Sequence, residues 1–437
     1  MRVLLISTYE LGHQPVHLAV PAGELRARGH DVTCLDLSVD AWDPAVLDGI
    51  DRVAISVPMH TAMRLAQEIL PQIHVPVALY GLYGSPPFQG EYLAPLVEWI
   101  DGAGSGALPA ATGALPARDL LPPLDRYAKL AVGDDVRLAG TVEAGRGCIS
   151  RCRHCPVPAV YDGRTRIVAV ADVVADVAQL VALGAEHISY GDPDFLSGPA
   201  HARRVVDAVH AAFPKLTFDI TTKVELALRH RDLFAAFADA GCLFVISAVE
   251  CVDDNVLRIL DKGHTAADAS AAVTMLRRHG IEPRPSLMPF TPWTTREALV
   301  ALTDWVAAHD LPGSIDPVQW SIRLLLPDGS LLLDEPTLQP HLTGYDHELL
   351  GHQWRAADPA MDVLQQRIAA IVEDGAGFDE VRALVRDEPV ARGHWTATCD
   401  RPHLTESWFC CAEPTTRQHL LVAGDVLQDR VEPAELA

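Results

Sequence analysis

The sequence predicts an α/β protein of several domains: an N-terminal doubly wound, Rossmann-like domain, a partial (β/α)6 barrel, and a mostly helical and irregular C-terminal segment. Three observations predict this order. Short Val, Ile and Leu runs alternate with helical patterns through the first hundred residues, a second alternation follows, and it fades from about residue 334. The chain has 437 residues, which is more than one ordinary hydrophobic core can organise.

The first domain is predicted over residues 1–125. Four short apolar runs are typical of buried parallel strands, and the segments between them have helical patterns. These runs are 2–8, 30–37, 52–58 and 75–81. A doubly wound sheet binds its ligand at the carboxyl ends of the strands, so the loop 9–15, "YELGHQP", would border such a site. Residues 101–124 are rich in Gly, Ala and Pro and are predicted to be a connection.

The partial barrel is predicted over residues 137–333. Six apolar runs recur about every thirty residues, with helical patterns such as 170–184 and 269–280 between them. The six runs are 138–145, 187–192, 216–222, 243–250, 282–289 and 317–325. Chemistry in such a barrel belongs at the carboxyl ends of the strands. Residues 334–437 are predicted to be a separate C-terminal domain.

The composition excludes several classes of protein. A net charge of −23 repels polyanions, so nucleic acid is not an expected partner. No run reaches the roughly 18 to 20 apolar residues of a membrane span, and the N-terminus has no secretion-signal pattern. Nine cysteines, an odd number without small-domain spacing, do not suggest a disulfide framework. We therefore expect a soluble cytoplasmic protein that acts on a small molecule, with neither nucleic acid nor membrane as partner.

Cys148, Cys152 and Cys155 follow the first barrel run in the stretch "GRGCISRCRHCP". Three thiolates this close in sequence can converge on one soft metal centre. Zinc is the alternative, but structural zinc takes four closed ligands and favours paired C-x2-C knuckles. An iron-sulfur cubane held by three cysteines leaves one iron open to a substrate. The spacing favours the cubane.

This C-x3-C-x2-C spacing after the first strand of a partial β/α barrel resembles the radical S-adenosylmethionine (SAM) superfamily. The resemblance implies a [4Fe-4S] cluster on the three cysteines, with SAM chelated to the fourth iron and cleaved by one electron. It also implies an electron donor such as flavodoxin or ferredoxin. The activity it implies is that of a transferase acting on a small-molecule substrate.

The resemblance also assigns residues at the strand ends to the cofactor site. Gly191 and Asp192 fall where the family contacts the SAM amino group, and Lys223 and Glu225 where ribose or carboxylate contacts are usual. Glu250 ends the fourth strand in a segment typical of the branch with a cobalamin-like N-terminal domain. The sixth implied cofactor contact is His154, inside the cysteine loop.

Local capping is the alternative for two of these segments. Asp192 can cap the next helix, and the "DKGHT" stretch can simply start one, with Thr265 as the N-cap. The positions stand in register on successive strands, which favours a SAM site over separate caps.

The N-terminal domain is similar to the cobalamin-binding domain of that branch. It lacks the Asp-x-His-x-x-Gly loop that ligates cobalt, and its loop has His13 without that motif. Some relatives bind cobalamin without this ligand, so cobalamin stays open, although the missing motif and the limits of fold analogy weigh against it. His13 is equally expected to be a surface or helix-start residue.

Three further cysteines, Cys399, Cys410 and Cys411, lie in a polar and aromatic C-terminal stretch without amphipathic period. Loops of this kind carry function more often than packing, so these thiols are candidate catalytic residues. By contrast, Cys34, Cys242 and Cys251 lie in apolar strand patterns and are predicted to be core.

The stretch "CCAEP" at 410–414 resembles the signature of the CUAEP/CCAEP-tail radical SAM group, some members of which place selenocysteine at one of the two positions. That group is associated with arsenic natural products such as arsinothricin. The resemblance implies transfer of the 3-amino-3-carboxypropyl group of SAM to a thiophilic acceptor, plausibly As(III) as arsenite, held by the tail cysteines.

Several alternatives stay open. An ordinary 5′-deoxyadenosyl radical could act on a carbon substrate, with or without cobalamin, and a non-enzymatic metalloid or redox sensor is a further class. In the tail, Cys399, His403, Cys410 and Cys411 could instead share a structural zinc, or the vicinal pair could be an incidental loop dipeptide.

Overall fold

The computed structural model describes residues 1–102, 112–389 and 401–406. These residues form two compact units, one of residues 1–128 with 178–184, the other of residues 129–177 with those from 185 on. The domain boundaries predicted at residues 125, 137 and 333 stay predictions. Within the described ranges, no helix is both long and apolar enough to cross a membrane.

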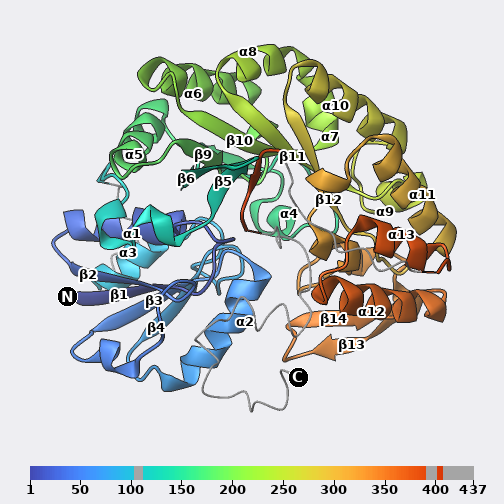
Figure 1. Ribbon diagram of the computed structural model, residues 1–437. Helices are drawn as coiled ribbons and strands as arrows, with labels where there is room; N and C mark the ends of the chain where they lie inside the picture. Colours follow the sequence, from blue (N-terminus) through green and yellow to red (C-terminus); the bar gives the residue numbers. More distant parts are fainter. Residues whose placement is uncertain (103–111, 390–400, 407–437) are drawn as a thin grey trace. The chain divides into compact units, whose positions relative to one another are not determined.

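The first unit contains a four-stranded parallel sheet with the strand order β2-β1-β3-β4 (Figure 1). The strands are β1 (Arg2–Ser7), β2 (Asp31–Asp36), β3 (Arg52–Ser56) and β4 (Val77–Tyr80). Its helices are α1 (Val16–Ala27), α2 (His60–Ile69) and α3 (Leu93–Asp101). All four predicted strands are present.

Strand β1 shows why helices cover both faces of this sheet. Val3 and Leu5 point to a core shared with α1 and α3, whereas Leu4 and Ile6 point to a second core that includes Ala66 of α2. Side chains alternate along a strand, so a continuous apolar run buries both faces. The doubly wound architecture is confirmed.

The second unit contains a curled seven-stranded sheet with the order β12-β11-β10-β9-β6-β5-β15. Its strands are β5 (Lys129–Val132), β6 (Asp135–Val142), β9 (His187–Tyr190), β10 (Thr217–Thr222), β11 (Cys242–Glu250), β12 (Glu282–Leu287) and β15 (His403–Leu404). The neighbouring strands β6, β9, β10, β11 and β12 are parallel, whereas β5 and β15 pair antiparallel at one edge. The predicted partial β/α barrel is confirmed as a half-barrel.

Helices follow the parallel strands and cover the convex side of the sheet, as α6, α8, α10 and α11 do in Figure 1. The helices of this part of the chain are α4 (Pro156–Tyr161), α5 (Val170–Ala182), α6 (Pro199–Ala212), α7 (Val224–Arg229), α8 (Phe234–Asp239), α9 (Asp254–Ile259), α10 (Ala266–Arg278) and α11 (Arg296–Ala308). Thr265 caps α10 in a capping box with Asp268, so the "DKGHT" stretch does start a helix, which was the alternative considered for it. A short hairpin of β7 (Gly145–Gly147) and β8 (Thr165–Ile167) was not predicted.

The sixth predicted barrel strand is not a strand. Residues Pro317–Ser321 form a 3-10 helix, and only an isolated bridge between Phe290 and Arg323 continues the sheet. Val318 and Trp320 are nevertheless buried, so the apolar run marked a core segment. A short apolar run alone does not distinguish a strand from another buried segment.

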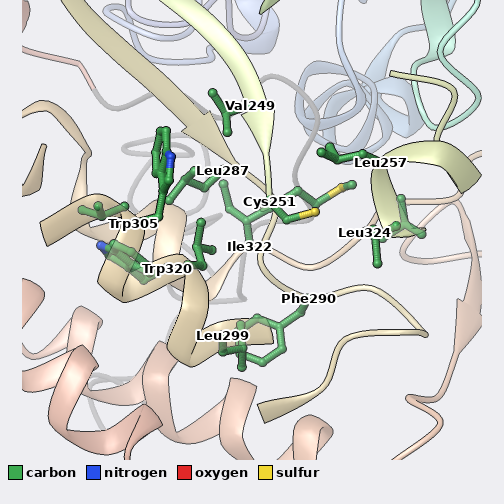
Figure 2. Packing of buried hydrophobic residues seen from close by; sticks show 14 of the residues in the cluster. Val249, Cys251, Leu257, Leu287, Phe290, Leu299, Trp305, Trp320, Ile322 and Leu324 are labelled. Atoms are coloured by element: carbon green, nitrogen blue, oxygen red, sulfur yellow. The ribbon is translucent and has the colours of Figure 1, made fainter. Parts of the chain in front are cut away.

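The described C-terminal residues form helices and irregular segments, as predicted, with one unpredicted hairpin. They include β13 (Leu342–Asp346), β14 (Gly351–Trp354), α12 (Pro359–Glu373) and α13 (Phe378–Val385). These helices share one large core with the half-barrel, and Cys251, Leu257, Trp320 and Ile322 belong to it (Figure 2). Cys242 is also buried and Cys34 packs against the first unit's core, so all three cysteines predicted as core are confirmed.

Residues 401–406 connect the two edges of the curled sheet. His403 and Leu404 pair with β5, while the guanidinium of Arg401 donates to Glu282 Oε1 (2.8 Å) at the start of β12 and to Ser314 Oγ (2.9 Å). Arg401 also reaches Asp310 Oδ2 at 2.5 Å. The segment therefore fastens both edges of the half-barrel.

Replacement Arg401→Ala should lower the free energy of unfolding by about 1 to 3 kcal/mol, because Glu282 and Ser314 lose charge-assisted partners in a half-buried site. The midpoint of urea unfolding, at constant m, measures this. Arg203→Ala is the control, since its exposed pair with Asp207 on α6 is worth less than about 0.5 kcal/mol. Equal losses in the two variants would contradict the fastening role.

Asp36, at the end of β2, makes the stability of the first unit depend on pH. Its carboxylate accepts from Tyr127 Oη (2.9 Å) and Ser38 Oγ (2.9 Å). Burial nevertheless raises the pKa of Asp36 to about 6. The folded protein thus keeps this proton at a pH where the unfolded chain releases it, and stability falls as pH rises through this range.

Asp36→Asn removes this dependence. The stability of the wild type relative to the variant should fall by about 1.5 kcal/mol between about pH 5 and pH 7.5, measured by urea unfolding at each pH. A difference that does not change with pH would show that Asp36 is not the titrating group.

Candidate functional site

The cysteine loop lies at the carboxyl edge of the half-barrel, between β7 and α4. Cys148 and Cys152 are buried and Cys155 is half-buried. Gly147 precedes the loop with φ +76°, and a Cβ there would lie 2.4 Å from Arg164 O, so the turn requires glycine. Ser150 N points at Cys148 Sγ (3.4 Å), a contact typical of cluster ligands.

Burial disfavours the thiolate form of Cys148 and Cys152. Burial, with Asp194 nearby, raises the pKa of Cys148 to about 11. Burial also raises the pKa of Cys152, while Lys262 and Lys223 oppose that rise. Metal binding displaces these protons, and the two lysines would compensate part of the resulting negative charge.

The donors of the cysteine loop suit an iron-sulfur cluster. In a cubane each cysteine binds a different iron, so three sulfurs of one loop can hold it together. Buried sulfurs with an N–H contact and neighbouring ammonium groups suit such a cluster.

Asp192 and Gly191 lie just beyond β9, next to the start of the cysteine loop. Asp192 Oδ2 accepts from Ala144 N (2.8 Å), and burial raises the pKa of Asp192 well above its ordinary value. A Cβ on Gly191 would lie 3.2 Å from Thr141 Cγ2. Asp192 therefore does not cap the next helix; it ties the end of β9 to the backbone after β6.

Asp194, which the sequence analysis missed, joins the ends of β9 and β10. It accepts from Lys223 N (2.9 Å), Thr222 Oγ1 (2.9 Å) and Leu196 N (3.0 Å). Burial raises the pKa of Asp194 to about 6. The second Asp of "GDPDF", two residues after the predicted one, was the signal in the sequence.

Lys223 and Glu225 pair with each other beyond β10. Lys223 Nζ lies 3.2 Å from Glu225 Oε2, and Glu225 also binds Arg229. Lys223 is 8% exposed, and its charge opposes the rise in the pKa of Cys152. Lys223 therefore faces the cysteine loop. Glu225 packs against Gly263, where a Cβ would lie 2.4 Å from its carboxylate.

Glu250 ends β11 in an unusual conformation. The ladder with β12 shifts register between Ala248 and Glu250, and Glu250 has φ +65°, which is rare for a side chain of this kind. Its Oε1 lies 2.9 Å from Lys262 Nζ and 3.2 Å from His154 Nε2. The bulge thus directs the carboxylate toward the cysteine loop.

Glu250, Lys262 and His154 are all buried. Burial favours neutral Glu250, but Lys262 and His154 hold its pKa well below the ordinary value. Burial lowers the pKa of His154, and its Nε2 lies 3.2 Å from Glu250 Oε1. Neighbouring His264 has its pKa lowered to about 4 by burial and Lys262. Lys262 and His264 were not predicted; the only signal was the "DKGHT" stretch.

The candidate catalytic residues Cys399, Cys410 and Cys411 lie outside the described residues. Of the suggested zinc ligands only His403 is described; its Nδ1 lies 2.9 Å from Arg401 O. His13, weighed as a cobalt ligand, lies in a turn closed by His13 N to Glu10 O (2.9 Å), and the histidine at the helix start is His17.

Residues 142–306 match the family model of the Radical SAM superfamily. The chain therefore carries a radical SAM domain, and the class of enzyme predicted from the cysteine triplet is confirmed at that level. This domain implies a [4Fe-4S] cluster and SAM as cofactors, as predicted.

The chain is similar to the hopanoid C-3 methylase of Methylococcus capsulatus, with 22% identity over 337 residues. The match covers 67% of this chain and 64% of the relative, so the chain spans less than two thirds of that enzyme.

Two solved structures share its fold across both units. One is the cobalamin-dependent SAM radical enzyme OxsB with aqua-cobalamin and SAM bound, at TM-score 0.65 and 13% identity, covering 86% of this chain and 67% of that one. The other is the radical SAM methyltransferase TsrM of Kitasatospora setae with tryptophan and a SAM analogue bound, at TM-score 0.62 and 18% identity, covering 88% and 89%. At these identities the likeness establishes the fold.

Single Ala variants of Cys148, Cys152 or Cys155 should lose iron and acid-labile sulfide almost completely after anaerobic reconstitution, because two thiolates cannot hold the cubane. Cys242→Ala is the matched control, since this cysteine is buried in the core and should leave iron content unchanged. Full iron content in any triplet variant would contradict the assignment.

Proposed function

We propose that this protein is a radical SAM transferase whose cluster is held by Cys148, Cys152 and Cys155. The observation that carries the proposal is the position of this loop, beside the ends of β9, β10 and β11, where Asp194, Lys223 and Glu250 lie. When bound, the cluster supplies one electron to the SAM sulfonium, and one carbon–sulfur bond of SAM breaks.

The surrounding residues would bind and orient SAM. The buried ammonium of Lys223 suits a carboxylate or hydroxyl of the ligand, and the carboxylate of Glu250 suits a hydroxyl or ammonium group. The carboxylates of Asp192 and Asp194 accept hydrogen bonds from backbone N–H groups. We therefore assign them to positioning the strand ends and not to contacting SAM. Burial of these groups excludes water from the reacting centre.

We further propose that the group transferred is the 3-amino-3-carboxypropyl group and that the acceptor is As(III). The support comes from the sequence: vicinal Cys410 and Cys411, with Cys399, are soft ligands suited to arsenite. A few residues before the vicinal pair, β15 pairs with β5 of the unit that carries the cysteine loop. An electron donor such as flavodoxin or ferredoxin would reduce the cluster.

A second candidate is cobalamin-dependent methyl transfer, supported by an observation in the first unit. Ser7 Oγ and Glu10 Oε2, at the carboxyl end of β1, are buried without a hydrogen-bond partner among the described residues. Glu10 Oε1 meanwhile accepts from Val16 N (3.0 Å) at the start of α1. Unpaired buried oxygens at this edge suit a bound ligand, and the cobalamin in OxsB makes cobalamin the ligand to test.

Incubation of the reduced protein with SAM and arsenite, followed by mass spectrometry, separates the candidates. Methylthioadenosine and an aminocarboxypropyl arsenic product support the first candidate. S-adenosylhomocysteine together with a requirement for cobalamin supports the second, and 5′-deoxyadenosine indicates adenosyl-radical chemistry.

The tail cysteines are tested by Cys410→Ala with Cys411→Ala. We expect the arsenic product to fall at least tenfold, while the iron content stays unchanged. Cys34→Ala is the matched control and should retain activity, because it lies in the core of the other unit. Full turnover in the double variant would refute the role given to the tail.

A further inference from the structure

The turn that follows α9, residues 260–265, packs against the cysteine loop through its backbone. Arg153 N donates to Leu260 O (2.9 Å), and Lys262 N donates to Leu257 O (3.0 Å) at the end of α9. Asp261 and Gly263 both have positive φ, at 55° and 73°. Thr265 then starts α10. The backbone on both sides of Lys262 is therefore fixed.

Lys262 is the buried charge at the centre of this turn. Its side chain is 2% exposed, and its Nζ donates to Glu250 Oε1 (2.9 Å). A buried ammonium is costly unless it is compensated, and Glu250 supplies that compensation. The same oxygen accepts from His154, between two of the cluster cysteines, so the turn and the cysteine loop share one carboxylate.

The charge of Lys262 is placed next to the cysteine loop by its contact with Glu250. Burial lowers the pKa of Lys262, but the negative charges of Glu250 and of the Cys152 and Cys155 thiolates outweigh burial and raise this pKa above its ordinary value. Lys223 approaches Cys152 as well, but it is shared with Glu225 near the surface. Among the described residues near the loop, Lys262 combines complete burial with a fixed backbone and electrostatic contact with two ligands.

We propose that Lys262 is a positioning residue that sets the reduction potential of the cluster and fixes the cysteine loop through Glu250 and His154. Each added electron makes the cluster more negative, and a fixed cation in a low-dielectric site stabilises the reduced state more than the oxidised state. Lys262 therefore raises the potential and makes the reduction that precedes SAM cleavage easier.

This inference rests on the cluster of the proposed function, and the two can fail separately. Iron content and the visible spectrum report whether the cluster is bound. The midpoint potential, measured by redox titration followed by electron paramagnetic resonance, reports the effect of the lysine.

Variants of the reconstituted full-length protein test the proposal. Lys262→Met should shift the midpoint potential to more negative values, and Lys262→Arg should restore it toward the wild type because it keeps the charge. Lys215→Met removes an exposed lysine and should leave the potential unchanged, because solvent and salt screen that charge.

A double variant tests the proposal even if Lys262→Met does not fold. Lys262→Met with Glu250→Gln leaves no buried charge unpaired, so it should fold and bind iron even if the single variant does not. Because Glu250→Gln alone also removes a nearby anion, that single variant is the reference for the double variant. The double variant should have the lower potential of the two, because they differ only in the cation next to the cysteine loop. Equal potentials in these two iron-loaded variants would overturn the proposal, since Lys262 would then only neutralise Glu250.

Discussion

The contact of Glu250 with Lys262 and His154 is the interaction on which the rest of the candidate site depends. It joins the end of β11, the turn after α9 and the cysteine loop through one buried carboxylate oxygen. Removal of any one member leaves an uncompensated polar group away from water. The bulge at Glu250 and its left-handed backbone are local costs that this contact offsets.

The half-barrel supplies the other constraint. Parallel strands bring their carboxyl ends to one edge, so residues far apart in sequence, such as Cys148, Asp194, Lys223 and Glu250, lie near one another. Asp192 and Asp194 hold this edge together by accepting from the backbone of neighbouring strands. Both carboxylates therefore stabilise the arrangement of the strand ends.

Much of this could be predicted, because the signals were local. Short apolar runs separated by helical patterns predicted the parallel strands of both sheets, and the spacing of three cysteines predicted the radical SAM domain. The segment 317–325 was assigned wrongly because its buried residues are as apolar as a strand's. Lys262 and Asp194 were missed because a lone Lys or Asp near a strand end is common in any sequence, and only its partner reveals its role.

The sequence by itself determined the doubly wound sheet, the half-barrel, the position of the cysteine triplet and the core cysteines, because periodicity and ligand spacing are properties of the chain alone. Only the tertiary structure decided which charged residues are committed to structure and which face the cluster. That distinction depends on burial and on partners brought from distant strands, as Glu250 meets Lys262 across a bulge and a turn, and Arg401 meets Glu282 at the opposite edge of the sheet.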